Sequence, residues 1–177
     1  MLENISHDKR YHKTLSFLKK HIQLSSSILD LGVNNPLSRL MQQQGYKVKN
    51  TSGEDLDEDQ SSLINSKAEV VTAFEILEHL LSPYQVLKSI KAEKLVVSVP
   101  LRLWFSPAYR SKNDMWDRHY HEFEDWQFDW LLEKTGWRII ASEKWTNPSS
   151  SIGIRTLFRY FTSRYYIVFA QKNKQEN

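Results

Sequence analysis

The residues best suited to chemistry are histidines and carboxylates in two short segments. Residues 75–79 (EILEH) hold two acids and a histidine, and residues 119–122 (HYHE) hold two histidines and an acid. An imidazole has an unperturbed pKa of about 6.5, so it can remove a proton near neutral pH. We therefore predict His79 as a general base and His121 as a second catalytic histidine. The alternative is that these histidines only pack and bind loop backbone.

The same histidines raise the question of a metal. If their segment is extended, the spacing of His119 and His121 places both imidazoles on one side, and such a pair can bind zinc. The chain has no cysteine, which excludes disulfides, thiolate zinc sites and thiol nucleophiles. We predict a site without a metal and keep the histidine pair as the alternative.

Length and composition predict a single domain over residues 1–177. Hydrophobic residues make up 40% of the chain and charged residues 25%, which is enough for a core and too apolar for a disordered tail. The net charge of +3 does not by itself favour nucleic acid, so we expect no nucleic-acid partner. The N-terminal residues lack the apolar segment of a secretory signal, and no apolar run is long enough for a transmembrane segment. These features predict a cytoplasmic protein.

Strand and helix patterns alternate along the chain. The expected strands are 28–31, 46–48, 68–74, 95–99, 137–142 and 165–170, and the expected helices are 1–25, one starting at Asn35-Pro36, 83–91, 124–135 and 154–162. The alternation predicts an α/β fold with a Rossmann-like open sheet that is mostly parallel, has an antiparallel last strand and carries helices on both faces.

Ligands of such sheets bind beyond the carboxyl ends of the strands. The loops that reach that edge are 32–36, 51–57, 74–81 and the long segment 101–122, which we predict to be a lid. Its aromatic residues, Trp104, Phe105, Tyr109 and Trp116, either line an acceptor pocket or pack on the sheet.

Three ordered segments resemble the class I S-adenosylmethionine-dependent methyltransferases. Residues 28–32 (ILDLG) are similar to the first motif of that family. Residues 74–80 (FEILEHL) are similar to the E-x-x-E-H segment of the branch that includes the ubiquinone-pathway O-methyltransferases. Residues 95–100, 119–123 and Gly136-Trp137 resemble the late region of that branch.

The resemblance implies S-adenosylmethionine as cofactor and a set of binding residues. Asp30 would meet the amino-acid part, Gly32 and Asn34 would form the turn beneath it, Ser52 or Asp55 would bind the ribose, and Phe74 and Glu75 would border the sulfonium. The branch also implies that Glu75, Glu78 and His79 can bind a divalent cation.

The sequence departs from the family pattern in three places. By spacing, Ser52 stands where the family has the acid that binds both ribose hydroxyls. Asn34 and Pro36 replace motif glycines, although Asn34 tolerates a positive φ better than most residues. The stretch 45–68 is too short for the usual strand, helix and strand. These departures motivate the alternative of a catalytically inactive, methyltransferase-like binding or scaffold protein. A dinucleotide enzyme is a weaker alternative, because residues 32–37 do not supply G-x-G-x-x-G.

Methyl transfer is an in-line displacement that depends mainly on positioning, so it requires no universal catalytic residue. We therefore predict O- or N-methylation of a small-molecule acceptor by a monomer or homodimer. The basic and aromatic segment 155–166 (RTLFRYFTSRYY) has three interpretations: a surface helix, a patch for acidic substrates or nucleic acid, and an interfacial membrane helix.

Overall fold

The chain forms one six-stranded sheet with the strand order β2-β1-β3-β4-β6-β5. The computed structural model describes residues 2–114, 116–146 and 153–173. The strands are β1 (Ser27–Asp30), β2 (Lys47–Asn50), β3 (Val70–Phe74), β4 (Lys94–Pro100), β5 (Trp137–Thr146) and β6 (Ser163–Lys172). The first four are parallel, and β6 lies antiparallel between β4 and β5. This arrangement confirms the predicted fold class.

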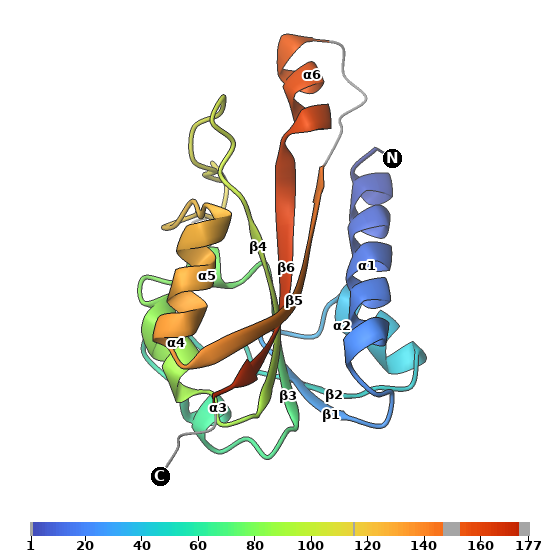
Figure 1. The fold of residues 1–177 in the computed structure, drawn as a ribbon, viewed down its shortest axis with the longest axis vertical. Helices are drawn as coiled ribbons and strands as arrows, with labels where there is room; N and C mark the ends of the chain where they lie inside the picture. Colours follow the sequence, from blue (N-terminus) through green and yellow to red (C-terminus); the bar gives the residue numbers. More distant parts are fainter. Residues whose placement is uncertain (1, 115, 147–152, 174–177) are drawn as a thin grey trace.

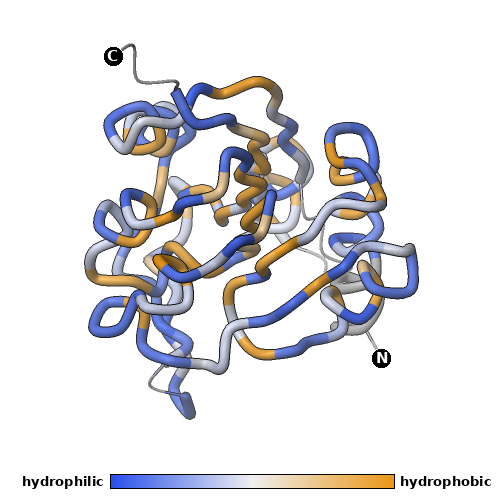
Figure 2. Tube along the Cα trace, turned by 90° about the horizontal axis from the view of Figure 1, so that it is seen from below, coloured by the Kyte–Doolittle hydropathy of each residue, from blue (hydrophilic) through white to orange (hydrophobic). Residues whose placement is uncertain are grey.

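Helices cover both faces of the sheet (Figure 1). They are α1 (Leu2–His21) and α2 (Pro36–Gln43) on one face, and α3 (Ser61–Ile64), α4 (Pro83–Ser89) and α5 (Asp125–Lys134) on the other. Each face has its own apolar core. Leu18 and Met41 are fully buried in the first, and Phe128 and Trp137 in the second. Figure 2 shows hydrophobic segments in the middle of the molecule.

The start of α2 follows the sequence expectation at Asn35-Pro36. The Asn35 side chain accepts hydrogen bonds from the backbone N–H of Leu37 and Ser38, at 2.9 and 3.1 Å. Two otherwise unpaired N–H groups of the first turn are thereby satisfied, and Pro36 has no N–H that needs a partner. The cap fixes where the chain leaves the turn after β1.

The middle of the chain is short, as predicted. Residues 51–69 contain only the one-turn α3, so β2 is the edge of the sheet. Lys47 and Lys49 are exposed on this edge strand, where charged side chains discourage pairing with another chain. A cavity of about 660 Å³ lies beside β2 and is also lined by residues of α3.

The last two strands are the longest and pair antiparallel, as expected for 137–142 and 165–170. Beyond the other helices they carry α6 (Ile154–Phe161) at the far end of the molecule (Figure 1). Within the described part of the chain, no helix combines the length and the apolar character needed to cross a bilayer.

The long segment between β4 and α5, residues 101–122, is attached to the sheet at several points. We call it the β4–α5 loop. The backbone of Leu101 forms an isolated parallel β-bridge with Phe123. Within the loop, the backbone of Arg110 forms an antiparallel β-bridge with Arg118. The backbone N–H groups of Tyr120 and His121 donate to the carbonyl of Glu78, at 2.8 and 3.2 Å. The two segments singled out for their histidines and acids therefore lie side by side.

Replacing the cap of α2 tests how much this contact stabilises the fold. Asn35→Ala removes the acceptor of two backbone N–H groups, so we expect the free energy of unfolding to fall by about 1 kcal/mol. Asn34→Ala is the matched control, because Asn34 is an exposed neighbour that caps nothing. Urea unfolding of both variants measures the difference. Equal losses in the two would contradict the capping role.

Candidate functional site

Asp30, at the end of β1, is buried beneath the turn that follows. The strand register places it between Asn50 of β2 and Thr72 of β3. Thr72 Oγ1 donates to Asp30 Oδ1 at 2.6 Å, and Asn50 Nδ2 donates to Asp30 Oδ2 at 3.1 Å. Burial raises the pKa of the Asp30 carboxyl to about 6, although these hydrogen bonds act in the opposite direction. Both carboxylate oxygens of Asp30 therefore accept hydrogen bonds from side chains of the neighbouring strands.

The turn itself is shaped by Gly32. Its φ of +98° is strained for any residue with a side chain, and a Cβ there would lie 3.4 Å from Ile76 Cδ1. The Gly32 N–H donates to Thr51 Oγ1 at 2.8 Å, which ties the turn to the end of β2. Asn34 does not adopt a positive φ, so the sharp turn survives without using that property of asparagine. The only positive-φ non-glycine among the described residues is Glu75.

A cavity of about 440 Å³ lies at the carboxyl ends of the parallel strands. Its walls come from the turn after β1, the segment after β2, the segment after β3 and the β4–α5 loop. The lining residues are Gly32, Thr51, Gly53, Glu54, Asp55, Leu56, Asp57, Ile76, His79, Leu80, Leu81, Trp116 and Tyr120. Three of the predicted site residues, Gly32, Asp55 and His79, meet on this one surface.

The acidic segment after β2 is more ordered than a solvated turn. Asp57 accepts from the backbone N–H groups of Leu81 and Ser82, both at 2.8 Å, and so joins this segment to the start of α4. Glu54 accepts from the backbone N–H of Ser52 at 2.7 Å. Asp55 is exposed on the cavity wall, where its carboxylate can accept hydrogen bonds from hydroxyl groups.

His79 ends a short 3-10 helix, Leu77–His79, and faces the cavity. Its Nδ1 lies 2.9 Å from the carbonyl oxygen of Arg118. Because a carbonyl only accepts, Nδ1 carries the hydrogen and Nε2 keeps its lone pair. Burial lowers the pKa of His79, which favours the neutral ring at neutral pH. His79 therefore has the tautomer and charge of a proton acceptor.

Two acids of the same segment are shielded from solvent, since the Glu78 side chain is fully buried and the Glu75 side chain is 15% exposed. Glu75 accepts from Ser98 Oγ at 2.8 Å and lies 3.7 Å from the guanidinium of Arg10. Burial raises the pKa of Glu75, and Arg10 partly offsets this. Burial raises the pKa of Glu78 well above its ordinary value, and the neighbouring Glu75 raises it further. Burial thus favours the protonated form of Glu78. At Glu75 the effect of burial is opposed by the positive charge of Arg10.

His119, rather than His121, is the histidine that contacts His79. The two rings meet edge to face with centroids 5.0 Å apart, and His119 Nδ1 lies 2.8 Å from Glu122 Oε1. His121 instead stacks on Phe123. Glu78, His79 and His119 each offer a ligand atom, all within 4.8 Å of one another, so they could hold a divalent cation. This set has His119 in place of Glu75, which the resemblance to the E-x-x-E-H branch implied as a ligand.

The other predicted site residues lie outside the cavity. Asp30 is beneath the turn and Asn34 is exposed above it. Ser52 lines the separate cavity beside β2. Phe74 packs against the core on the side of α1. These positions leave the predicted roles of these residues untested.

Sequence reasoning missed Arg10 and Ser98, which partner Glu75 from α1 and β4. Neither belongs to a motif or has an informative spacing. Their role comes from tertiary packing alone, as α1 brings Arg10 against Glu75 and against the ring of Tyr165.

Comparison with known proteins identifies the family. A family model described as a methyltransferase domain matches residues 3–142. The chain belongs to this methyltransferase-domain family. The match confirms the family recognised from the motifs, whereas the branch with the E-x-x-E-H segment stays a prediction. Comparison with curated proteins finds no match.

Solved structures similar to this methyltransferase domain cover almost all of it at low identity. One is the methyltransferase partner of the Trm112 activator from Haloferax volcanii, with 11% identity, TM-score 0.68, and coverage of 99% of this chain and 95% of that chain. Another is 1,6-didemethyltoxoflavin-N1-methyltransferase from Burkholderia thailandensis with bound 1,6-didemethyltoxoflavin and S-adenosylhomocysteine, with 16% identity, TM-score 0.60, and coverage of 95% and 84%. A third is the [4+2]-cyclase SpnF, with 13% identity, TM-score 0.60, and coverage of 92% and 81%. These likenesses show the fold.

Asp30→Asn tests the buried charge beneath the turn. Because burial raises the pKa of the folded acid from 3.8 to about 6, the carboxylate opposes folding above pH 6, and this cost disappears as the pH falls toward 4. This rise in pKa corresponds to about 3 kcal/mol of the free energy of unfolding. We expect the stability of the variant relative to wild type to be higher at about pH 8 than at about pH 4, by up to that amount. Urea unfolding at both pH values measures it, and a pH-independent difference would contradict the assignment.

Proposed function

We propose that this methyltransferase domain transfers a methyl group from S-adenosylmethionine to an oxygen or nitrogen of a small-molecule acceptor. The observation that carries the proposal is the cavity of about 440 Å³ that joins the Gly32 turn, Asp55 and His79 at the carboxyl ends of the parallel strands. Open α/β sheets bind ligands at this edge. The family match and the S-adenosylhomocysteine bound to the Burkholderia thailandensis enzyme support the choice of cofactor.

The residues present fit such a nucleoside. Gly32 leaves the turn without a side chain, so the cofactor can approach the backbone there. The Asp55 carboxylate suits the two ribose hydroxyls, and Leu56, Leu80 and Leu81 offer apolar surface for a base. When bound, the cofactor supplies an activated methyl group. The protein then has to position the acceptor and exclude water.

His79 is placed to take the proton that the acceptor loses. Nε2 of its neutral ring keeps a lone pair and lies 3.7 Å from Glu78 Oε1, and the bond from Nδ1 to the Arg118 carbonyl holds the ring in place. Trp116 and Tyr120 reach the same cavity from the β4–α5 loop, and they can limit the access of water. His121, which stacks on Phe123 beside this loop, stays a candidate for contact with the acceptor.

A binding or scaffold protein without catalysis is the second candidate. Asn34 and Pro36 replace motif glycines, and SpnF shows that a cyclase can have the same fold. The structure favours the enzyme, because Asn34 is exposed and neither Asn34 nor Pro36 lines the cavity.

Cofactor binding is tested by calorimetric titration with S-adenosylmethionine, S-adenosylhomocysteine and NAD. We expect the first two to bind and NAD not to bind. Asp55→Asn should weaken S-adenosylhomocysteine binding about tenfold or more, because hydrogen bonds to a charged acceptor are lost. Glu58→Gln is the matched control, an exposed acid of the same segment that does not line the cavity.

The outcomes separate the candidates. If the folded protein binds neither nucleoside, the result favours the binding or scaffold protein. If it binds NAD alone, the assignment of S-adenosylmethionine as cofactor is wrong. Equal affinities of the Asp55 and Glu58 variants would remove Asp55 from the site.

The base is tested by His79→Ala. We expect turnover to fall by about a hundredfold while S-adenosylhomocysteine affinity changes little, because a general base acts only in the chemical step. The wild-type rate should rise with pH through a pKa below 6.5 and then stay level, since only the neutral ring accepts a proton. Equal loss of turnover and affinity would assign His79 to structure.

Chelation distinguishes a base from a metal ligand. We propose that no metal takes part, because in-line displacement needs none and because burial favours a protonated Glu78. Turnover should then survive treatment with EDTA. If EDTA abolishes turnover and added Mg²⁺ or Mn²⁺ restores it, an ion is bound by Glu78, His79 and His119.

A further inference from the structure

The outer face of α6 carries large apolar side chains in contact with solvent. We call Ile154, Leu157, Tyr160 and Phe161 the α6 ridge; they are 75%, 57%, 56% and 81% exposed. Their spacing places them on one side of the helix. Scattered exposed apolar residues are ordinary, whereas a contiguous ridge of them marks a site of interaction.

The helix is held at the far end of the molecule. The antiparallel pair of β5 and β6 extends past the other helices and ends at α6 (Figure 1). The helix is anchored beside the ridge, since Phe158 packs against Trp104 and Phe105 of the β4–α5 loop with ring centroids 4.9 and 5.5 Å apart. Trp104 is itself 66% exposed and extends the apolar surface. The α6 ridge is therefore exposed to solvent on a helix that packs against the β4–α5 loop.

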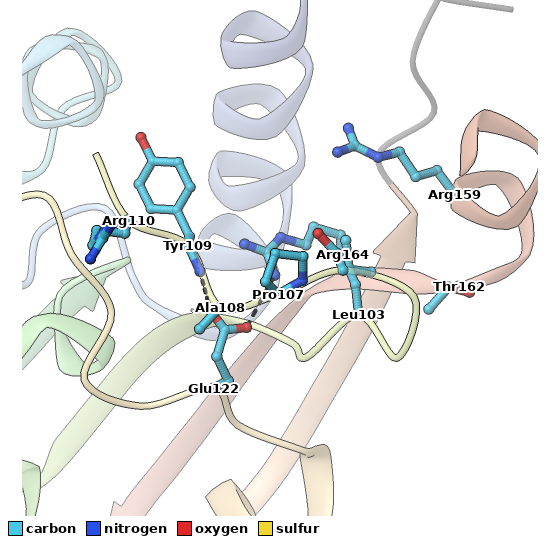
Figure 3. Close-up of a pocket in the computed structure, with 10 residues that line it drawn as sticks. Leu103, Pro107, Ala108, Tyr109, Arg110, Glu122, Arg159, Thr162 and Arg164 are labelled. Carbon is cyan, nitrogen blue, oxygen red and sulfur yellow. Dashed lines mark hydrogen bonds and ion pairs between the residues drawn. The ribbon is translucent and has the colours of Figure 1, made fainter. Parts of the chain in front are cut away.

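The charge around the ridge is positive. Residues 153–164 contain Arg155, Arg159 and Arg164 and no acidic residue. Arg159 and Arg164 line a cavity of about 290 Å³ between α6 and the β4–α5 loop. In Figure 3, Arg159 reaches from α6 across this cavity toward Pro107 and Arg164.

The one acid in the lining of this cavity is already bound. Glu122 accepts from the backbone N–H of Tyr109 at 2.9 Å, and it lies 2.8 Å from His119 and 3.8 Å from the guanidinium of Arg164. Arg159 is the arginine that this acid leaves for another anion. The cavity therefore suits a negatively charged group such as a phosphate, which arginine binds with two parallel hydrogen bonds.

We propose that α6 is a membrane-interface helix whose ridge enters the headgroup region of a bilayer while Arg159 binds lipid phosphate. An apolar face beside basic residues, with tryptophan and tyrosine at the boundary, is the pattern of such helices. A second copy of the chain is a poorer occupant, because its own α6 would bring arginines against arginines. The inference is independent of the proposed function, since membrane binding requires neither cofactor nor turnover.

Vesicle sedimentation of the full chain tests the proposal. We expect binding to phosphatidylcholine vesicles that contain phosphatidylglycerol, weaker binding to pure phosphatidylcholine, and a decrease with added salt. Leu157→Ser combined with Phe161→Ser should reduce binding to both vesicles about tenfold or more, because two buried side chains are lost. Arg159→Gln should reduce binding to the anionic vesicles about fivefold and binding to pure phosphatidylcholine by less, because only the anionic surface adds a net negative charge to the lipid phosphates.

The control uses two other exposed aromatic residues. Trp126 and Trp130 on α5 are each 57% exposed and lie on a different helix, so Trp126→Ser and Trp130→Ser should leave vesicle binding unchanged. Circular dichroism and thermal unfolding of all variants show that each is folded. Loss of binding in the controls as well would mean that exposed aromatic surface in general, rather than α6, drives adsorption.

Three results would overturn the proposal. Wild-type protein that binds neither kind of vesicle has no such surface. Ridge variants that bind as well as wild type place the surface elsewhere. A wild-type dimer that becomes monomeric in the ridge variants, without vesicle binding in either, would assign the ridge to self-association, and sedimentation velocity detects this.

Discussion

A buried carboxylate holds together the edge of the sheet where the cavity lies. Asp30 ends β1 and is bound from β3 by Thr72 and from β2 by Asn50. Asn50 also donates to the carbonyl of Gly32, at 3.2 Å, so one amide joins the carboxylate to the turn above it. The desolvation of Asp30 is unfavourable, and hydrogen bonds to both oxygens are what make it tolerable. The conformation of Gly32, and with it the floor of the cavity, depends on this network.

The same edge carries a second carboxyl group, Glu75, which is largely shielded from solvent and is partnered by residues from distant parts of the chain. Glu75 sits in a positive-φ conformation after β3, with Ser98 of β4 on one oxygen and Arg10 of α1 near the other. Arg164, from β6, donates to the carbonyl of Leu101 and lies 3.8 Å from Glu122. Backbone strain and buried charge of this kind persist only where the surrounding fold holds them. The first helix and the last strand are therefore parts of the site as well as of the fold.

Local signals were sufficient to predict the fold. The cap at Asn35-Pro36, the apolar run that ends at Gly32 and the helical spacing of Phe128 and Leu132 each follow from short-range rules, and the structure contains each element. Parallel order then places the loops at one edge without further information. Gly32 and Asp55 were predicted from the resemblance to the methyltransferase motifs and His79 from the pKa of an imidazole, and each of them follows a strand end directly or closely.

Long-range packing explains what the sequence did not show. Spacing alone treats His119 and His121 as equivalent, yet the bridge within the β4–α5 loop turns His119 toward His79 and leaves His121 on Phe123. The position of Ser52 depends on a bond from its own N–H to Glu54, and it lies on the other cavity. Arg10 had no local signal, because a charged residue on a surface helix is ordinary until the sheet is built against it.

The segment after β2 forms a wall of the cavity although β2 is the last strand at this edge of the sheet. Without a further strand beyond β2, the segment after β2 has no neighbour in the sheet to hold it, and Asp57 attaches it to the start of α4 through two backbone N–H groups. The cavity wall then consists of this attached segment and of Trp116 and Tyr120 from the β4–α5 loop. That loop is in turn fixed by Glu78, whose carbonyl receives two of its N–H groups. The carboxylate of Asp57 is thus the side-chain connection between this wall of the cavity and the start of α4.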